Sequence, residues 1–142
     1  MKRIAALSAM LLLMACAAVA KPNASFSTAP FPRTLTNARY VYVAAYDGDQ
    51  FDPNLMPEDR SAIATVQDQL QQWGRYVIVY RPQDADMTLL VQSRPTEDVV
   101  AVFDAQVPGQ SYLWRAMGRN GLQKGETPLL TQLHDAVDKA SK

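Results

Sequence analysis

The stretch "ARYVYVAAYDGDQFDPNLMPEDRSAI", residues 38–63, decides the fold, because a strand pattern passes directly into a helix start. Its first part, residues 38–46, carries β-branched, aromatic and alanine side chains on both faces of an extended chain, which predicts a central strand. Pro57 with Glu58 and Asp59 then favours a helix, since proline suits the first helical position and acids suit the positive end of the dipole.

The pattern downstream predicts one amphipathic helix. Ile63, Val66, Leu70 and Trp73 recur at spacings of three and four residues, which places them on one face. Gly74 is a natural helix stop. We therefore expect a helix from Pro57 to Trp73.

Four further segments read as strands: "RYVIVYRP" (75–82), "MTLLVQSR" (87–94), "VVAVFD" (99–104) and "SYLWRAM" (111–117). The connections between the last three are short, which favours an antiparallel meander. The sequence leaves the orientation of the 75–82 strand open.

Thr127 and Pro128 form a cap and first position for a closing helix, with Leu130, Leu133 and Val137 on its apolar stripe. The expected order is β-α-β-β-β-β-α. We predict an α+β fold of two layers, α/β-like, in which both helices cover one face of a mixed sheet of about five strands.

The N-terminus has the organisation of an export signal, residues 1–20. Met1-Lys2-Arg3 precedes an apolar run up to residue 15, which is shorter than the roughly 20 residues of a membrane span. Two cleavage sites compete. "AVA" before Lys21 suits ordinary signal peptidase, whereas "LMAC" resembles a bacterial lipobox in which Cys16 becomes the lipidated first residue.

Residues 21–36, "KPNASFSTAPFPRTLT", are rich in Pro, Ser and Thr without apolar periodicity, which is typical of a tether. Residues 37–142 are then expected to form a single α/β domain. Cys16 is the only cysteine, so this domain folds without a disulfide and relies on its core.

Composition excludes several classes of function. The 14 basic and 14 acidic residues leave no basic excess for nucleic acid. His134 is the only histidine, and we expect it to be an ordinary surface or half-buried residue. The chain has no phosphate-binding glycine motif, no zinc ligand set and no convincing triad, so we predict no cofactor and no enzymatic activity.

The acidic stretch after the first strand admits two interpretations. Asp47, Asp49 and Glu58 match positions 1, 3 and 12 of a calcium loop, but Phe51 and Asp52 stand where that loop needs a polar ligand and glycine. We favour a structural role, in which a turn is followed by the first turn of a helix with acidic residues at the positive end of its dipole. The alternative is a ligand or metal site, whose candidates are Asp47, Asp49, Asp52 and Glu58.

Aromatic side chains are concentrated in the strands: Tyr40, Tyr42, Tyr76, Tyr80, Tyr112 and Trp114. Core packing and cross-strand pairing account for most of them. If helices leave one sheet face bare, some would form an exposed stripe that docks a protein, glycan or peptide. We expect four arginines to be exposed to solvent at the rims of the strands: Arg75, Arg81, Arg94 and Arg115.

Three dipeptides carry a family likeness: Trp73-Gly74, Ala85-Asp86 and Leu113-Trp114. With the strands around them they resemble small exported bacterial α/β proteins of unknown function, and more distantly the periplasmic domains of envelope lipoproteins. The resemblance implies a binding or assembly role and supplies no catalytic residues. Physically, Asp86 suits a turn-capping acceptor, and Trp73 and Trp114 suit structural positions.

Our first hypothesis is therefore a non-enzymatic envelope protein, periplasmic or anchored by a lipid on Cys16, that binds another envelope protein or cell-wall material. It would meet the membrane only through that lipid. The alternative is a small-ligand or metal-binding protein that uses the Asp47–Asp52 loop.

Overall fold

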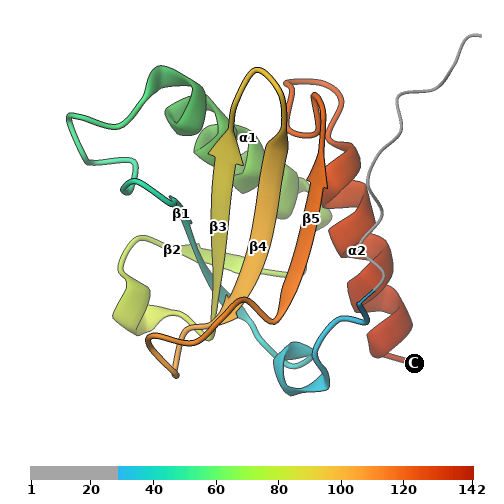
Figure 1. The fold of residues 1–142 in the computed structure, drawn as a ribbon. Coiled ribbons are helices and arrows are strands. Elements are labelled where there is room, and N and C mark those ends of the chain that lie inside the picture. Colours follow the sequence, from blue (N-terminus) through green and yellow to red (C-terminus); the bar gives the residue numbers. More distant parts are fainter. Residues whose placement is uncertain (1–28) are drawn as a thin grey trace, which may run out of the picture.

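The computed structural model describes residues 29–142, which form one five-stranded sheet and two α-helices (Figure 1). The α+β fold expected from the sequence is confirmed. The elements are β1 (Tyr40–Ala45), α1 (Pro57–Trp73), β2 (Val77–Val79), β3 (Met87–Ser93), β4 (Asp98–Asp104), β5 (Trp114–Gly118) and α2 (Pro128–Ala140).

The strands are ordered β2-β1-β3-β4-β5, so β1 lies inside the sheet as predicted. It pairs in parallel with both β2 and β3. Helix α1 returns the chain to the start of β2, and the segment with the short 3-10 helix Pro82–Asp84 returns it to the start of β3. The β3-β4-β5 meander is antiparallel, which confirms the inference from its short connections. The third strand of this meander begins at Trp114 rather than Ser111.

Both helices have the expected limits. Pro57 is the first residue of α1, and Gly74 ends it in the left-handed conformation with φ 72°, its N–H bonded to the Leu70 carbonyl. Helix α2 begins at Pro128. The Thr127 side chain makes no capping bond; its carbonyl oxygen accepts the Leu130 N–H instead.

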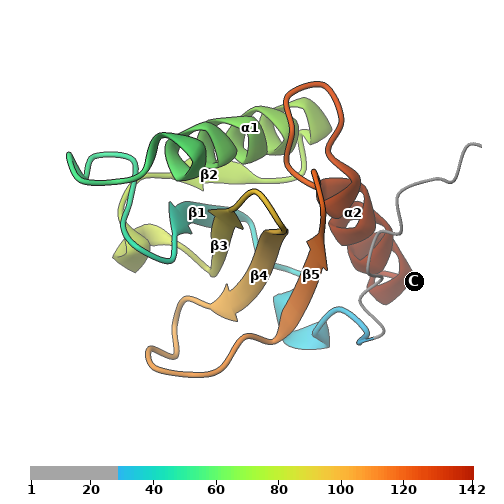
Figure 2. The ribbon, with the colours of Figure 1, turned by 45° about the horizontal axis from the view of Figure 1, so that its top comes forward.

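One side of the sheet packs against both helices to form the core. Val43, Leu89 and Val100 point to this side, where α1 contributes Ile63 and α2 contributes Leu133. All five side chains are at most 2% exposed. Figure 2 shows α1 lying across the sheet and α2 beside β5. The expected arrangement of two layers is therefore present, and neither α-helix of residues 29–142 lies on the other side of the sheet.

The domain begins earlier in the chain than residue 37. Phe31 and Leu35 are 2% and 4% exposed and belong to the core, and Arg33–Leu35 forms a short 3-10 helix. Residues 31–36, assigned to a tether, are thus packed, because two apolar side chains anchor a segment whose composition otherwise suggests a linker. The signal peptide, both cleavage sites, Cys16 and the rest of the tether lie outside the described residues.

Within residues 29–142, neither α-helix combines the length and the apolar character that a bilayer crossing requires.

Candidate functional site

The acidic loop after β1 directs its carboxylates to its own backbone. Asp49 accepts the Phe51 N–H at 2.9 Å and the Tyr42 hydroxyl at 3.3 Å, and Asp52 accepts the Asn54 N–H at 2.8 Å. The two bonds to backbone N–H groups form Asx-type turns, which stabilise an irregular loop. Burial and the neighbouring Asp49 carboxylate raise the pKa of Tyr42, so its hydroxyl stays protonated and donates.

Arg60 of α1 closes the loop from the other side. Its guanidinium donates to the backbone carbonyl of Gln50 and, at 2.7 Å, to that of Asp52. These bonds connect two backbone carbonyl oxygens of the loop to α1. The segment therefore has internal partners along most of its length.

No three histidine, cysteine, aspartate or glutamate side chains within the described part of the chain converge as a metal-holding group. The candidate set of Asp47, Asp49, Asp52 and Glu58 is therefore not assembled in the structure. The reason is that Asp49 and Asp52 bond to nearby backbone, Asp47 pairs with an arginine, and Glu58 is exposed at the start of α1.

A buried ion pair lies behind the loop. Asp59 of α1 is only 1% exposed, and both its oxygens lie 2.9 Å from Arg94 Nη1. Its Oδ1 also accepts the Ser93 N–H at 2.8 Å, and Arg94 Nη2 reaches Asp47 at 2.9 Å. Bonding to Asp59 raises the pKa of Arg94 above its ordinary value. The cluster fastens α1 and the loop to the end of β3.

Sequence reasoning missed this cluster. The sequence predicts Asp59 as a helix-start acid and Arg94 as a residue at a strand rim. The helix does start there, but the third position of α1 faces the sheet, so the Asp59 carboxylate is buried and needs a cation. The only signal in the sequence was a lone arginine immediately after a strand.

A second buried acid lies near the first, at the turn of the β3–β4 hairpin. Asp98 is 3% exposed, accepts the Ser93 hydroxyl at 2.8 Å and accepts the Leu122 N–H at 2.9 Å. It therefore joins the β3–β4 hairpin to the loop that precedes α2. Both its oxygens have structural partners.

The residues expected to be structural have the following contacts. Asp86 accepts the N–H groups of Arg39 and Tyr40 at 2.9 and 3.0 Å, which holds its pKa below the usual value. It thus caps the start of β1 and not its own turn. Trp114 is 1% exposed in the core, whereas Trp73 is half-buried.

His134 lies on the outer part of α2. Its Nδ1 is 3.3 Å from Asp138, and its ring centroid is 4.3 Å from that of Trp73. The histidine side chain is 43% exposed. Its surroundings are those of a surface residue stacked on a tryptophan.

The helix-free side of the sheet carries large side chains. Figure 1 looks onto this side, with α1 behind β3 and β4. We call this surface the open face, and on β1, β3, β4 and β5 it comprises Tyr40, Tyr42, Ala44, Thr88, Leu90, Gln92, Val99, Ala101, Phe103, Arg115 and Met117, with Tyr46 and Tyr112 at its border. Successive strand residues alternate between faces, which separates this set from the core. The exposed aromatic stripe considered from the sequence would lie on this face.

Arg115 projects over this face from β5, the edge strand of the sheet. It is opposite Ala101 in the sheet, and its guanidinium carbon is 5.5 Å from the centre of the Tyr112 ring. Its Nε is buried and has no hydrogen-bond partner in the described part of the chain. Burial raises the pKa of Tyr46, although the nearby Arg115 charge acts in the opposite direction. The expectation that Arg115 lies at a strand rim fits its place on the edge strand, where its side chain is half-buried beside the Tyr112 ring.

The chain was compared with protein-family models, with curated proteins and with solved structures, and none of the three comparisons found a match. No residue role is therefore transferred from a relative. The likeness to small exported proteins and envelope lipoproteins remains a prediction from the sequence.

Proposed function

We propose that this protein is a non-catalytic docking module of the bacterial cell envelope and that it binds a partner protein through the open face. The observation that supports the proposal most is the character of that face. Tyr112 and Tyr46 are 48% and 43% exposed beside the half-buried Phe103 and Met117. Aromatic residues, methionine and arginine are the types enriched in protein interfaces.

The arrangement of these residues resembles the centre of an interface. Ala44, Val99 and Ala101 are at most 5% exposed, so larger side chains border a closely packed floor. Contiguous apolar surface on a sheet is unusual in a monomer and marks contact sites. The presence of aliphatic side chains, such as Leu90, beside the rings favours a protein over a cell-wall glycan.

Arg115 indicates the chemistry of the partner. A buried guanidinium nitrogen without an acceptor is unfavourable, and a carboxylate is the acceptor that suits it best. A partner with an acidic residue inside an apolar patch would satisfy it. The described residues of the open face include no acidic side chain, so a second copy packed face to face would not supply this acid, and we propose a different protein.

The envelope location rests on the sequence of residues 1–28. The export signal places the domain outside the cytoplasm, and a lipid on Cys16 would keep it at a membrane surface. Intact mass spectrometry of the protein from its host separates the two cleavage sites. A chain beginning at an acylated Cys16 supports the lipoprotein, and an unmodified chain beginning at Lys21 supports a freely diffusing protein.

Site-specific photocrosslinking in the native host tests the docking surface. A benzophenone side chain at Tyr112 should yield a discrete crosslinked species, and the same group at Gln71, on the exposed side of α1, should not. Arg115→Glu should abolish the Tyr112 crosslink by placing a negative charge opposite the partner's acid. Identical products from both positions would contradict the proposal.

A further inference from the structure

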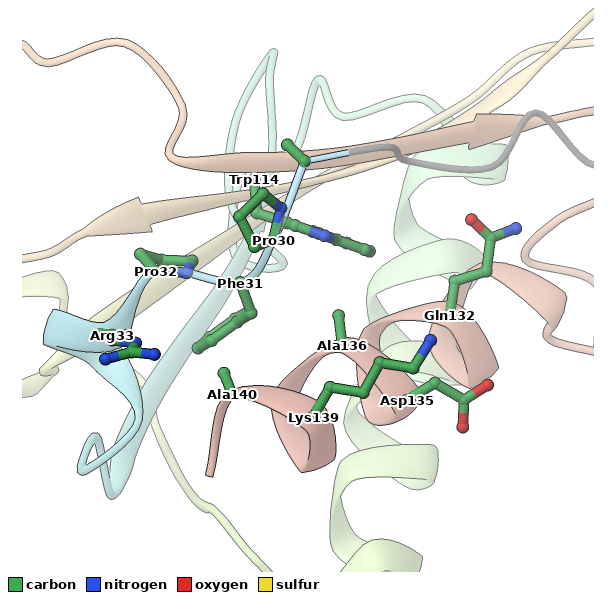
Figure 3. A pocket seen from close by; sticks show the side chains of 11 residues that line it. Pro30, Phe31, Pro32, Arg33, Trp114, Gln132, Asp135, Ala136, Lys139 and Ala140 are labelled. Atoms are coloured by element: carbon green, nitrogen blue, oxygen red, sulfur yellow. The ribbon is translucent and has the colours of Figure 1, made fainter. Parts of the chain in front are cut away.

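A cleft of about 820 Å³ lies between α2 and the segment that precedes β1, away from the open face (Figure 3). Its walls are parts of the packed domain. Phe31 is anchored in the core on one side, and the last turns of α2, with Ala136 and Ala140, form the other. The volume is within the range of sites for small molecules.

The cleft contains an unused hydrogen-bond donor. Trp114 lines it and is only 1% exposed, and its indole Nε1 has no hydrogen-bond partner among residues 29–142. Figure 3 shows the Trp114 ring along the cleft between Pro30 and Gln132, with its nitrogen in view. An indole N–H can only donate, so a molecule in the cleft must offer an acceptor to satisfy it.

The charges around the cleft favour an anion. Arg33 and Lys139 line it and form no ion pair with any residue of the described chain. Among the described lining residues Asp135 is the only acid, and its carboxylate lies 3.9 Å from His134 Nδ1. In Figure 3 the Lys139 ammonium extends from α2 toward the side of the cleft that holds Trp114.

We infer that this cleft binds a small carboxylate with an apolar body. The carboxylate accepts the Trp114 N–H and pairs with Lys139, while the apolar body lies against Pro30, Phe31 and Ala136. A charge-assisted bond to the indole would satisfy a buried donor, and the ammonium would balance the ligand's charge. This site is independent of the open face and of any partner there.

Octanoate is a suitable probe, and the two indole N–H signals of the ¹⁵N-labelled mature chain are the readout. Trp73→Phe assigns the remaining signal to Trp114. We expect octanoate to shift the Trp114 indole proton downfield in a saturable manner. Octyltrimethylammonium, which has the same alkyl chain and the opposite charge, should leave it in place.

Lys139→Gln should weaken octanoate binding by about tenfold, and the matched variant Lys124→Gln, in the loop before α2, should not change it. Both lysines are exposed, so neither change threatens folding. The inference is overturned if octanoate does not move the Trp114 signal, which would mean that water or the chain before residue 29 occupies the donor. It is also overturned if both amphiphiles act equally or if Lys139→Gln has no effect.

Discussion

Replacing Arg94 by methionine should destabilise the domain by about 3 kcal/mol, because it leaves the Asp59 carboxylate buried without a counter-charge. Asp59 is 1% exposed, and two of its three bonds come from Arg94 Nη1. Removing one partner of a buried ion pair costs about 3 to 5 kcal/mol. The lower end applies because the Arg94 side chain is itself 26% exposed and water can approach.

Two matched variants isolate the buried pair in urea unfolding at pH 7. Asp47→Asn removes only the exposed partner of Arg94, whose side chain is 61% exposed, and should cost less than about 1 kcal/mol. Adding Asp59→Asn to Arg94→Met should recover most of the loss, since no buried charge then remains. The reasoning is refuted if Arg94→Met costs no more than Asp47→Asn.

Three further predictions concern stability. Backbone N–H groups favour ionised Asp86 and lower its pKa, so its contribution to stability is present above its unfolded-state pKa and is lost as the pH falls through the lower folded value. Asp86→Asn should therefore cost about 1 kcal/mol at pH 7 and reduce the loss of stability on acidification. An unchanged dependence of the urea-unfolding free energy on pH would contradict this. Trp114→Ala should cost about 3 to 5 kcal/mol and the half-buried Trp73→Ala clearly less, and equal losses in denaturant titrations would remove Trp114 from the core. Gly121→Ala would drive a Cβ into the buried Leu129 side chain and should cost about 1 to 3 kcal/mol, so an unchanged thermal melt would show that Leu129 relaxes freely.

Local patterns predicted the fold because each element carried its own signal. The apolar spacing from Ile63 to Leu70 indicated the helix α1, and Pro57 and Gly74 indicated its two ends, which are those of the structure. The parallel pairing of β1 with β2 had no such signal, because β2 has only three residues and its orientation depends on where α1 returns the chain.

The candidate sites were less predictable because they depend on contacts distant in sequence. Asp59 and Arg94 are 35 positions apart, and nothing near either residue indicates the other. Arg115 and Tyr46 approach each other only once the sheet order is known. Residues 31–36 lacked periodicity, and two apolar anchors were too few to distinguish a packed arm from a linker.

The docking role of the open face is tested most directly by hydroxyl-radical footprinting of the protein in envelope fractions and of the purified domain. Tyr112 and Met117 report on the open face, and Met56, which is 44% exposed just before α1, serves as the internal control. We predict that Tyr112 and Met117 are labelled in the purified domain and protected in the envelope, with Met56 labelled equally in both. Equal labelling of all three residues in both samples would contradict the proposal that a partner covers this face.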